Sequence, residues 1–433
     1  RSRAFFFRRV MISFLRHFEP QWALSESWPL SEASGRCRES AHSLDAAAAN
    51  DEPCPECIKI FVRRFGQEEK PFTLWVREST TLDAVKHMIH QQVGLRPCDQ
   101  VVAFDETPLL EDNKSMSDYN IYEGCSLTLV RKVLGIVATA SADSTAKIWD
   151  ATNGECIQTL EGHGLQTATG HAGWVRSAVF SPDGFLVLTA SVDRTAKIWD
   201  TTNGKCVKTL AGHKGGVWSA VFSHDAESVL TASVDKTCKI WETSTGDCVQ
   251  TLVGHEGKVW FAVFSSDASL VLTASDDKTA RIWSALDGRC MLKFRGHVGG
   301  VRSAVFSNDG AYVLTSSEDQ TAKIWNATNG KCVQTLKGHT GWVWFASFSP
   351  DGSKVLTASE DHTVKIWMSR SGQCLQSLRG HLRGVRSAVF SVDASLVLTA
   401  SDDESVKIWN TKGGECIQTL EGHARGVWSA VFC

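Results

Sequence analysis

The sequence contains no apolar run that approaches the ~20 residues of a membrane-spanning helix. It also lacks a basic excess, because 45 Lys and Arg face 48 Asp and Glu and the formal net charge is -3. Electrostatic capture of nucleic acid or of an acidic membrane is therefore not expected. Phosphate-binding loops and nucleophile elbows are missing, and no second Cys or His pair follows the zinc-like spacing of Cys54 and Cys57. These absences argue against an enzyme, a cofactor and a bound metal.

The most informative feature present is a repeat of 42 residues, the step from one Gly-His pair to the next. A fixed period of this size indicates one supersecondary unit stacked on copies of itself. An insertion at 164–171 stretches the first Trp step to 50 and duplicates the Gly-His found at His163. The repeated residues are His171, His213, His255, His297, His339, His381 and His423, and Trp149, Trp199, Trp241, Trp283, Trp325, Trp367 and Trp409.

Within each repeat, apolar residues alternate over short runs that end in turn residues, which is typical of strands. The resulting sheets would have apolar residues on both faces. Each sheet therefore needs a neighbour on either side, and a ring of sheets meets that need. Around one repeat, the expected strands are Cys206–Leu210, Val217–Ser223, Val229–Ser233 and Thr237–Trp241, with a hairpin turn at Asn203 and Gly204.

The Gly-His start, the Asp before the last strand and the Ile-Trp end of each unit resemble WD40 repeats. This family folds as a β-propeller, and its blades commonly carry a hydrogen-bonded network of Asp, His, Ser or Thr, and Trp. The resemblance assigns that network to His213, Ser233, Asp235 and Trp241 and to their equivalents in the other units. Each bond of such a buried network contributes about 1 kcal/mol net. Most His residues are explained in this way, without a catalytic role.

The chain ends predict how the ring closes. Residues 135–160 supply three strands, and residues 426–433 supply one inner strand with nothing after it. Joined together, they would make a seventh blade and leave no open sheet edge. We expect a mainly β chain with a seven-bladed propeller over residues 133–433. The alternative is a longer array that has been truncated, since residue 1 is Arg and the chain stops after Phe432 and Cys433.

Seven cysteines occupy one outer-strand position in each blade. Packed sheets lie about 10 Å apart, whereas a disulfide needs Cα atoms within about 7 Å. These cysteines cannot pair with one another, so we expect small buried apolar residues in a reducing compartment, the cytoplasm or the nucleus. They are Cys156, Cys206, Cys248, Cys290, Cys332, Cys374 and Cys416.

Residues 1–56 show no sustained periodicity and are expected to be disordered. The first eighteen residues combine five Arg with five Phe and no acid, which is the charge bias of an organelle transit peptide. The alternative is that this stretch is not genuine coding sequence.

Residues 57–132 show a different pattern. Two alternating runs, Ile58–Arg63 and Phe72–Val76, are followed by apolar residues at helical spacing from Leu82 to Val93, with Thr81 as the N-cap. Further strand-like pieces follow. The opening IKIFV, the closing SLTLV and the run Ser117–Ile121 resemble ubiquitin, which implies a small α+β β-grasp domain.

The ubiquitin resemblance implies docking to ubiquitin-proteasome machinery rather than conjugation, because Arg131 to Gly135 runs on without a Gly-Gly end. The family's apolar recognition patch maps onto Phe65, Ala103 and Val130. The alternative is an inert domain that only caps the propeller.

The repeats differ at two positions that commonly face the ligand-binding mouth in the WD40 family. Trp and Arg are frequent at interface hot spots, and carboxylates beside aromatic faces suit a Lys or Arg side chain. The alternative is that Arg and acid neutralise one another across the rim. The mouth residues are Arg176, Trp218, Trp260, Arg302, Trp344, Arg386 and Trp428, with Asp276, Glu318, Glu360 and Asp402 on four consecutive blades and Ala142, Val192 and Val234 on the other three.

The sequence thus predicts a non-enzymatic adaptor whose mouth binds a protein segment, with a basic segment favoured, and whose ubiquitin-like domain docks to ubiquitin-proteasome components. The alternative is a structural scaffold of a cytoskeletal or ribonucleoprotein assembly with an inert ubiquitin-like domain. No cofactor, nucleic acid or membrane partner is expected.

Overall fold

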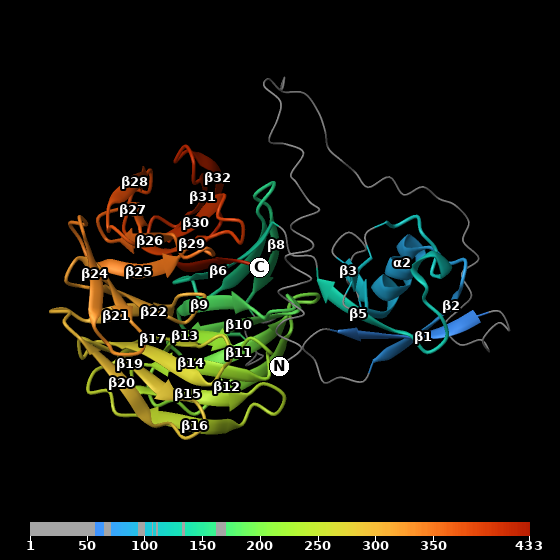
Figure 1. The fold of residues 1–433 in the computed structure, drawn as a ribbon, viewed down its shortest axis with the longest axis horizontal. Coiled ribbons are helices and arrows are strands. Elements are labelled where there is room, and N and C mark those ends of the chain that lie inside the picture. The colour runs from blue at the N-terminus through green and yellow to red at the C-terminus, as the bar shows by residue number, and fades with distance from the viewer. Residues whose placement is uncertain are drawn as a thin grey trace. The chain divides into compact units, whose positions relative to one another are not determined.

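The computed structural model describes residues 57–64, 71–93, 100–105, 107–109, 111–131, 135–161 and 170–433. The chain divides into two compact units between Val130 and Arg131 (Figure 1). The expectations for residues 1–56 lie outside the described residues. No helix in the described part is long and apolar enough to cross a bilayer.

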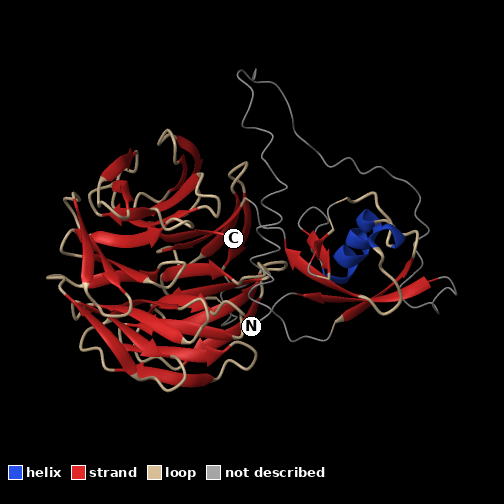
Figure 2. Ribbon diagram, in the orientation of Figure 1, coloured by secondary structure: helices blue, strands red, loops and turns tan. Residues whose placement is uncertain are grey.

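The first unit is a five-stranded sheet with one described α-helix (Figure 2). Strand β1 pairs antiparallel with β2 and parallel with β5. The helix buries Leu82, Val85 and Ile89, which recur on one face, and the Thr81 side chain accepts a bond from the Ala84 N–H. This is the expected β-grasp pattern. The sheet order is β2 (Phe72–Arg77), β1 (Cys57–Arg64), β5 (Ser126–Arg131), β3 (Gln100–Phe104) and β4 (Thr107–Pro108), with α2 at Leu82–Val93 and a 3-10 turn, η2, at Ser117–Tyr119.

The second unit consists of seven four-stranded antiparallel sheets. Six are formed from consecutive strands, each ordered from the centre outward. These sheets are β9 (Val175–Phe180), β10 (Leu186–Ser191), β11 (Thr195–Asp200) and β12 (Cys206–Ala211); β13 (Val217–Phe222), β14 (Ser228–Ser233), β15 (Thr237–Glu242) and β16 (Cys248–Val253); β17 (Val259–Phe264), β18 (Leu270–Ser275), β19 (Thr279–Ser284) and β20 (Cys290–Arg295); β21 (Val301–Phe306), β22 (Tyr312–Ser317), β23 (Thr321–Asn326) and β24 (Cys332–Lys337); β25 (Val343–Phe348), β26 (Lys354–Ser359), β27 (Thr363–Met368) and β28 (Cys374–Arg379); and β29 (Val385–Phe390), β30 (Leu396–Ser401), β31 (Val406–Asn410) and β32 (Cys416–Leu420).

The remaining sheet joins strands from the two ends of this unit. It contains β33 (Val427–Phe432), β6 (Ile136–Ser141), β7 (Ala146–Asp150) and β8 (Cys156–Leu160). Strands β33 and β6 pair antiparallel, from Val427 opposite Ser141 to Phe432 opposite Val137. Each innermost strand contacts the innermost strand of the next sheet, and β33 contacts both β29 and β9. The seven sheets therefore form a closed ring.

The hydrophobic core lies between successive sheets. In one such layer, Leu230 and Ile240 pack against Val259, Val271 and Trp283 of the next sheet. Every residue from Val229 to Ser233 in β14 is buried, because the sheet is covered on both faces. This explains why apolar residues such as Val229 and Leu230 stand at successive positions of this strand, with only small residues beyond them, of which Thr231 and Ser233 are polar. The sheets confirm the mainly β fold class.

A chain of hydrogen bonds holds the strands of each blade together. Trp241 Nε1–H donates to Thr231 Oγ1 at 2.8 Å, Thr231 Oγ1 lies 2.8 Å from His213 Nε2, and His213 Nδ1 lies 2.8 Å from Asp235 Oδ2. The same chain occurs in the other six blades through Thr139, Thr189, Thr273, Thr315, Thr357 and Thr399. The geometry favours Gly at the first position of the Gly-His pair, because a Cβ on Gly212, whose φ is +156°, would lie 3.2 Å from the Trp241 ring.

The sequence prediction placed Ser233 in this chain, and that assignment was wrong. Ser233 Oγ instead donates to the carbonyl of Gly215 at 3.0 Å and accepts the N–H of Asp235 at 3.1 Å. Ser233 therefore stabilises the turn that positions Asp235. Thr231 is the hydroxyl that links His213 to Trp241.

The cysteines of the outer strands are not buried, contrary to the expectation. Six of the seven are exposed, and Cys206 is half-buried. Each begins the outermost strand of its sheet, where no further strand or sheet covers it. None of the seven forms a disulfide.

Candidate functional site

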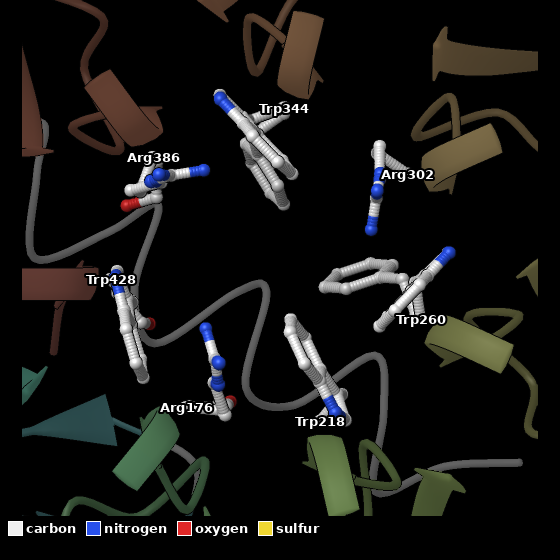
Figure 3. A pocket seen from close by; sticks show the side chains of 12 residues that line it. Arg176, Trp218, Trp260, Arg302, Trp344, Arg386 and Trp428 are labelled. Atoms are coloured by element: carbon white, nitrogen blue, oxygen red, sulfur yellow. The ribbon is translucent and has the colours of Figure 1, made fainter. Parts of the chain in front are cut away.

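The seven Trp and Arg residues predicted at the mouth line one cavity of about 120 Å³ at the centre of the ring (Figure 3). Each is the second residue of an innermost strand, and each sits at a β-bulge: Val217 pairs with Ser233 and Ser219 with Ala232, which leaves Trp218 unpaired. A bulge re-aims a side chain. The set, hereafter the Arg–Trp ring, is Arg176, Trp218, Trp260, Arg302, Trp344, Arg386 and Trp428.

Guanidinium groups stack on indoles around the ring. The Arg302 guanidinium lies 4.2 Å from the centroid of Trp260 and 4.8 Å from that of Trp344, and Arg386 lies 4.0 Å from Trp344. Trp218 and Trp260 meet edge to face at 4.4 Å. Such contacts each contribute about 0.5–2 kcal/mol. The ring is therefore a preorganised surface rather than a set of independent side chains.

The four acids lie beside members of the Arg–Trp ring. Arg302 forms an ion pair with Glu318, and Arg386 Nε donates to Asp402 Oδ2 at 2.6 Å. Indoles contact the other two acids. Trp344 Nε1 donates to Glu360 Oε2 at 2.5 Å, and Trp260 Nε1 lies 3.4 Å from Asp276 Oδ1. Neutralisation of acid by Arg, the alternative considered from the sequence, thus occurs at Glu318 and Asp402, and Arg386 also lies 3.5 Å from Glu360.

Arg176 differs from the other two arginines. Its guanidinium lies between the rings of Trp428 and Trp218, at 3.3 and 3.7 Å from their centroids. Its Nε, like that of Arg302, is buried and has no hydrogen-bond partner among the described residues, but no ion pair joins Arg176 to a described carboxylate. Burial, reinforced by the charge of Arg386, lowers the pKa of Arg176 to about 9.

Sequence reasoning missed four aromatic residues of the site. Trp174 and Trp342, both more than two-fifths exposed, lie 5.4 Å from Trp428 and Trp344. The sequence does mark these two residues, because the position before the first Val of the innermost strand is Trp in these two repeats and Gly or Lys in the others. Phe261 and Phe345 line the cavity at positions where the other repeats have Ser, and their centroids lie 5.5 Å apart.

Of the apolar patch expected on the first unit, only the side chain of Ala103 lies in the described part. Ala103, in β3, is only 1% exposed, so its predicted place at the surface was wrong. Phe65 and the side chain of Val130 lie outside the described part. Cys54 of the zinc-like pair also lies outside it, and no cluster of three or more metal-ligating side chains occurs among the residues described.

Two family models match the chain. The model "WD domain, G-beta repeat" matches residues 154–200, 204–242, 246–284, 288–326, 330–368 and 372–410, which together make up more than half of the chain. The ubiquitin family model matches residues 60–134.

Similar proteins match only parts of the chain. "Nuclear distribution protein PAC1" of Mycosarcoma maydis is 48% identical over 48 residues, 11% of this chain and 9% of that protein. "Nuclear distribution protein nudF 1" of Talaromyces marneffei is 32% identical over 143 residues, 33% of this chain and 28% of that protein. "Ubiquitin D" of Homo sapiens is 36% identical over 83 residues, 19% of this chain and 50% of that protein. The chain belongs to the WD40-repeat family, and a ubiquitin-family domain precedes its repeats.

Proposed function

We propose that this protein is a non-enzymatic adaptor of the cytoplasm or nucleus whose Arg–Trp ring binds a segment of a partner protein. The supporting observation is the convergence of four Trp and three Arg on one cavity. Trp and Arg dominate interface hot spots, because they provide large contact area together with directional hydrogen bonds. The exposed indoles of Trp174 and Trp342 extend this surface beyond the cavity.

The charge of the rim favours a basic segment on one side. On the blades that carry acids, the four carboxylates outnumber the two guanidinium groups of the Arg–Trp ring, those of Arg302 and Arg386, while Lys258 and Arg383 lie further out on the same blades. The side chain of Glu360 is 45% exposed and can accept a Lys or Arg from a partner. Binding there should weaken as salt increases.

Partner capture with matched variants tests this proposal. Trp344→Ala and Glu360→Gln should each reduce capture of the wild-type partners, because they remove an indole face and a carboxylate of the ring. Tyr312→Ala is the control: Tyr312 is also exposed, but it begins β22 at the opposite end of the sheet, since Ser317 and not Tyr312 pairs with Val301. Equal capture by all three variants would contradict the proposal.

We further propose that the ubiquitin-like domain docks to ubiquitin-proteasome components. The match to the ubiquitin family supports this proposal. Purified proteasomal ubiquitin receptors should bind the full chain and should bind Phe65→Asp more weakly. The rival function is a structural scaffold, which the names of the nuclear distribution relatives favour; an unchanged set of partners for Phe65→Asp would support it.

A further inference from the structure

The three arginines of the Arg–Trp ring differ in their ion pairs with carboxylates. Arg302 pairs with Glu318, and Arg386 pairs with Asp402. No ion pair joins Arg176 to a described carboxylate, and this distinguishes it from the other two arginines. The reason lies in the sequence: the rim position that carries an acid on four blades is Ala142, Val192 or Val234 on the other three.

The surroundings of Arg176 leave only one kind of contact open. Trp428 and Trp218 cover the two faces of its guanidinium (Figure 3). The N–H groups of a guanidinium point outward in its plane, so stacking on both faces leaves the donors along the edge uncovered. In Figure 3 that edge points toward the centre of the ring. Two parallel N–H donors in one plane match the two oxygens of a carboxylate.

An unpaired, partly desolvated cation is costly to maintain. The lowered pKa of Arg176 reflects this cost, since burial and the neighbouring charge of Arg386 both disfavour its charged form. An anion at the guanidinium edge would relieve both effects. Groups perturbed by burial in a cavity are often functional.

We infer that Arg176 is the anchor for a carboxylate of the segment bound at the Arg–Trp ring, either an Asp or Glu side chain or a free C-terminus. The inference rests on the proposed function. A single negative charge suits the site better than a phosphate, which carries nearly two, because Asp402 already lies near enough to act on Arg176. The Arg–Trp ring would then select a segment by its charges, with a Lys or Arg side chain beside the acidic blades and a carboxylate at Arg176.

Peptide display on the full chain tests the inference. Wild-type protein should enrich peptides with an Asp, a Glu or a free C-terminus. Synthetic peptides should then show whether the bound carboxylate belongs to a side chain or to the C-terminus. Replacing the selected carboxylate by its amide should weaken binding to wild type by about ten-fold or more, the size expected of a hydrogen bond to a charged group. The same replacement should change binding to Arg176→Gln by less than about two-fold, while Arg176→Lys should keep part of the preference.

Arg386→Gln is the matched control, because Arg386 already has carboxylate partners; this variant should retain the preference for the acid over the amide. An equal effect of amidation on wild type and Arg176→Gln would overturn the inference and leave the proposed function intact. A wild-type protein that enriches no peptide at all would overturn both. Stronger binding of phosphopeptides than of peptides with a carboxylate would also overturn the inference, in favour of a phosphate site.

Discussion

His423 Nδ1 lies 2.7 Å from Asp143 Oδ2, although the two residues are 280 positions apart in the chain. The equivalent bond within a single repeat, from His213 to Asp235, spans only 22 positions. His423 also reaches Thr139 Oγ1 at 2.7 Å. The side-chain network that organises each blade therefore also fastens β33 to the sheet of β6, β7 and β8.

Replacing this His should loosen the closure of the ring. His423→Ala is expected to lower the free energy of unfolding by about 1–3 kcal/mol, because it leaves buried partners unsatisfied, and to increase amide hydrogen exchange in β6 and β33. His213→Ala should lower stability by a similar amount, but with faster exchange confined to its own blade. Equal protection of β6 and β33 in the two variants would contradict this role.

Much of the second unit could be predicted from the sequence, because a 42-residue period with alternating apolar residues restricts each repeat to a sheet that needs two neighbours. The convergence of the Arg–Trp ring followed from the resemblance to WD40 repeats, which implied that these positions face the mouth. Three expectations failed: Ser233 as the link between His213 and Trp241, the burial of the outer-strand cysteines, and the surface position of Ala103. Thr231 and Ser233 are two residues apart on one strand and so share a face, and alternation cannot tell which hydroxyl reaches His213. The pairing of each rim acid depends on side-chain conformations that the sequence does not specify.

Stability should fall as the pH falls, in two stages. Burial lowers the pKa of His171, His213 and His255 below the usual value of about 6.5. These residues stay neutral in the folded protein, whereas the unfolded chain takes up protons below about pH 6.5. Their contribution is therefore complete above that pH and is lost as the pH falls.

A second loss is expected below about pH 4. Burial alone would raise the pKa of Asp235, but hydrogen bonds from Thr237 and His213 outweigh it and lower the pKa. Stability from this ionised carboxylate is present above the unfolded pKa and disappears as the pH falls through the folded one. Urea unfolding at pH 7.5, 5.5 and 3.5 measures both stages. Unchanged or greater stability at pH 5.5 would contradict the first.

The outer-strand cysteines should react in the native protein. Cys248 is exposed and begins β16, whereas Cys238, in the same blade, is fully covered and burial raises its pKa. Because the thiolate is the reactive form, brief alkylation followed by peptide mass spectrometry should label Cys248 and its six equivalents but not Cys238. Equal labelling of Cys238 and Cys248 would show that the blade opens under native conditions.

Arg176 and Arg302 occupy equivalent positions in their blades, but removing their charges should change stability by different amounts. Arg302→Met leaves Glu318 without its ion-pair partner in a half-buried place, so we expect a loss of about 1–3 kcal/mol. Arg176→Met gives up two cation–π contacts but also removes an unpaired cation, so the change should stay within about 1 kcal/mol. Urea unfolding of both variants measures the difference. If Arg176→Met proved as destabilising as Arg302→Met, Arg176 would be a structural part of the ring, and its lack of a carboxylate partner would carry no functional meaning.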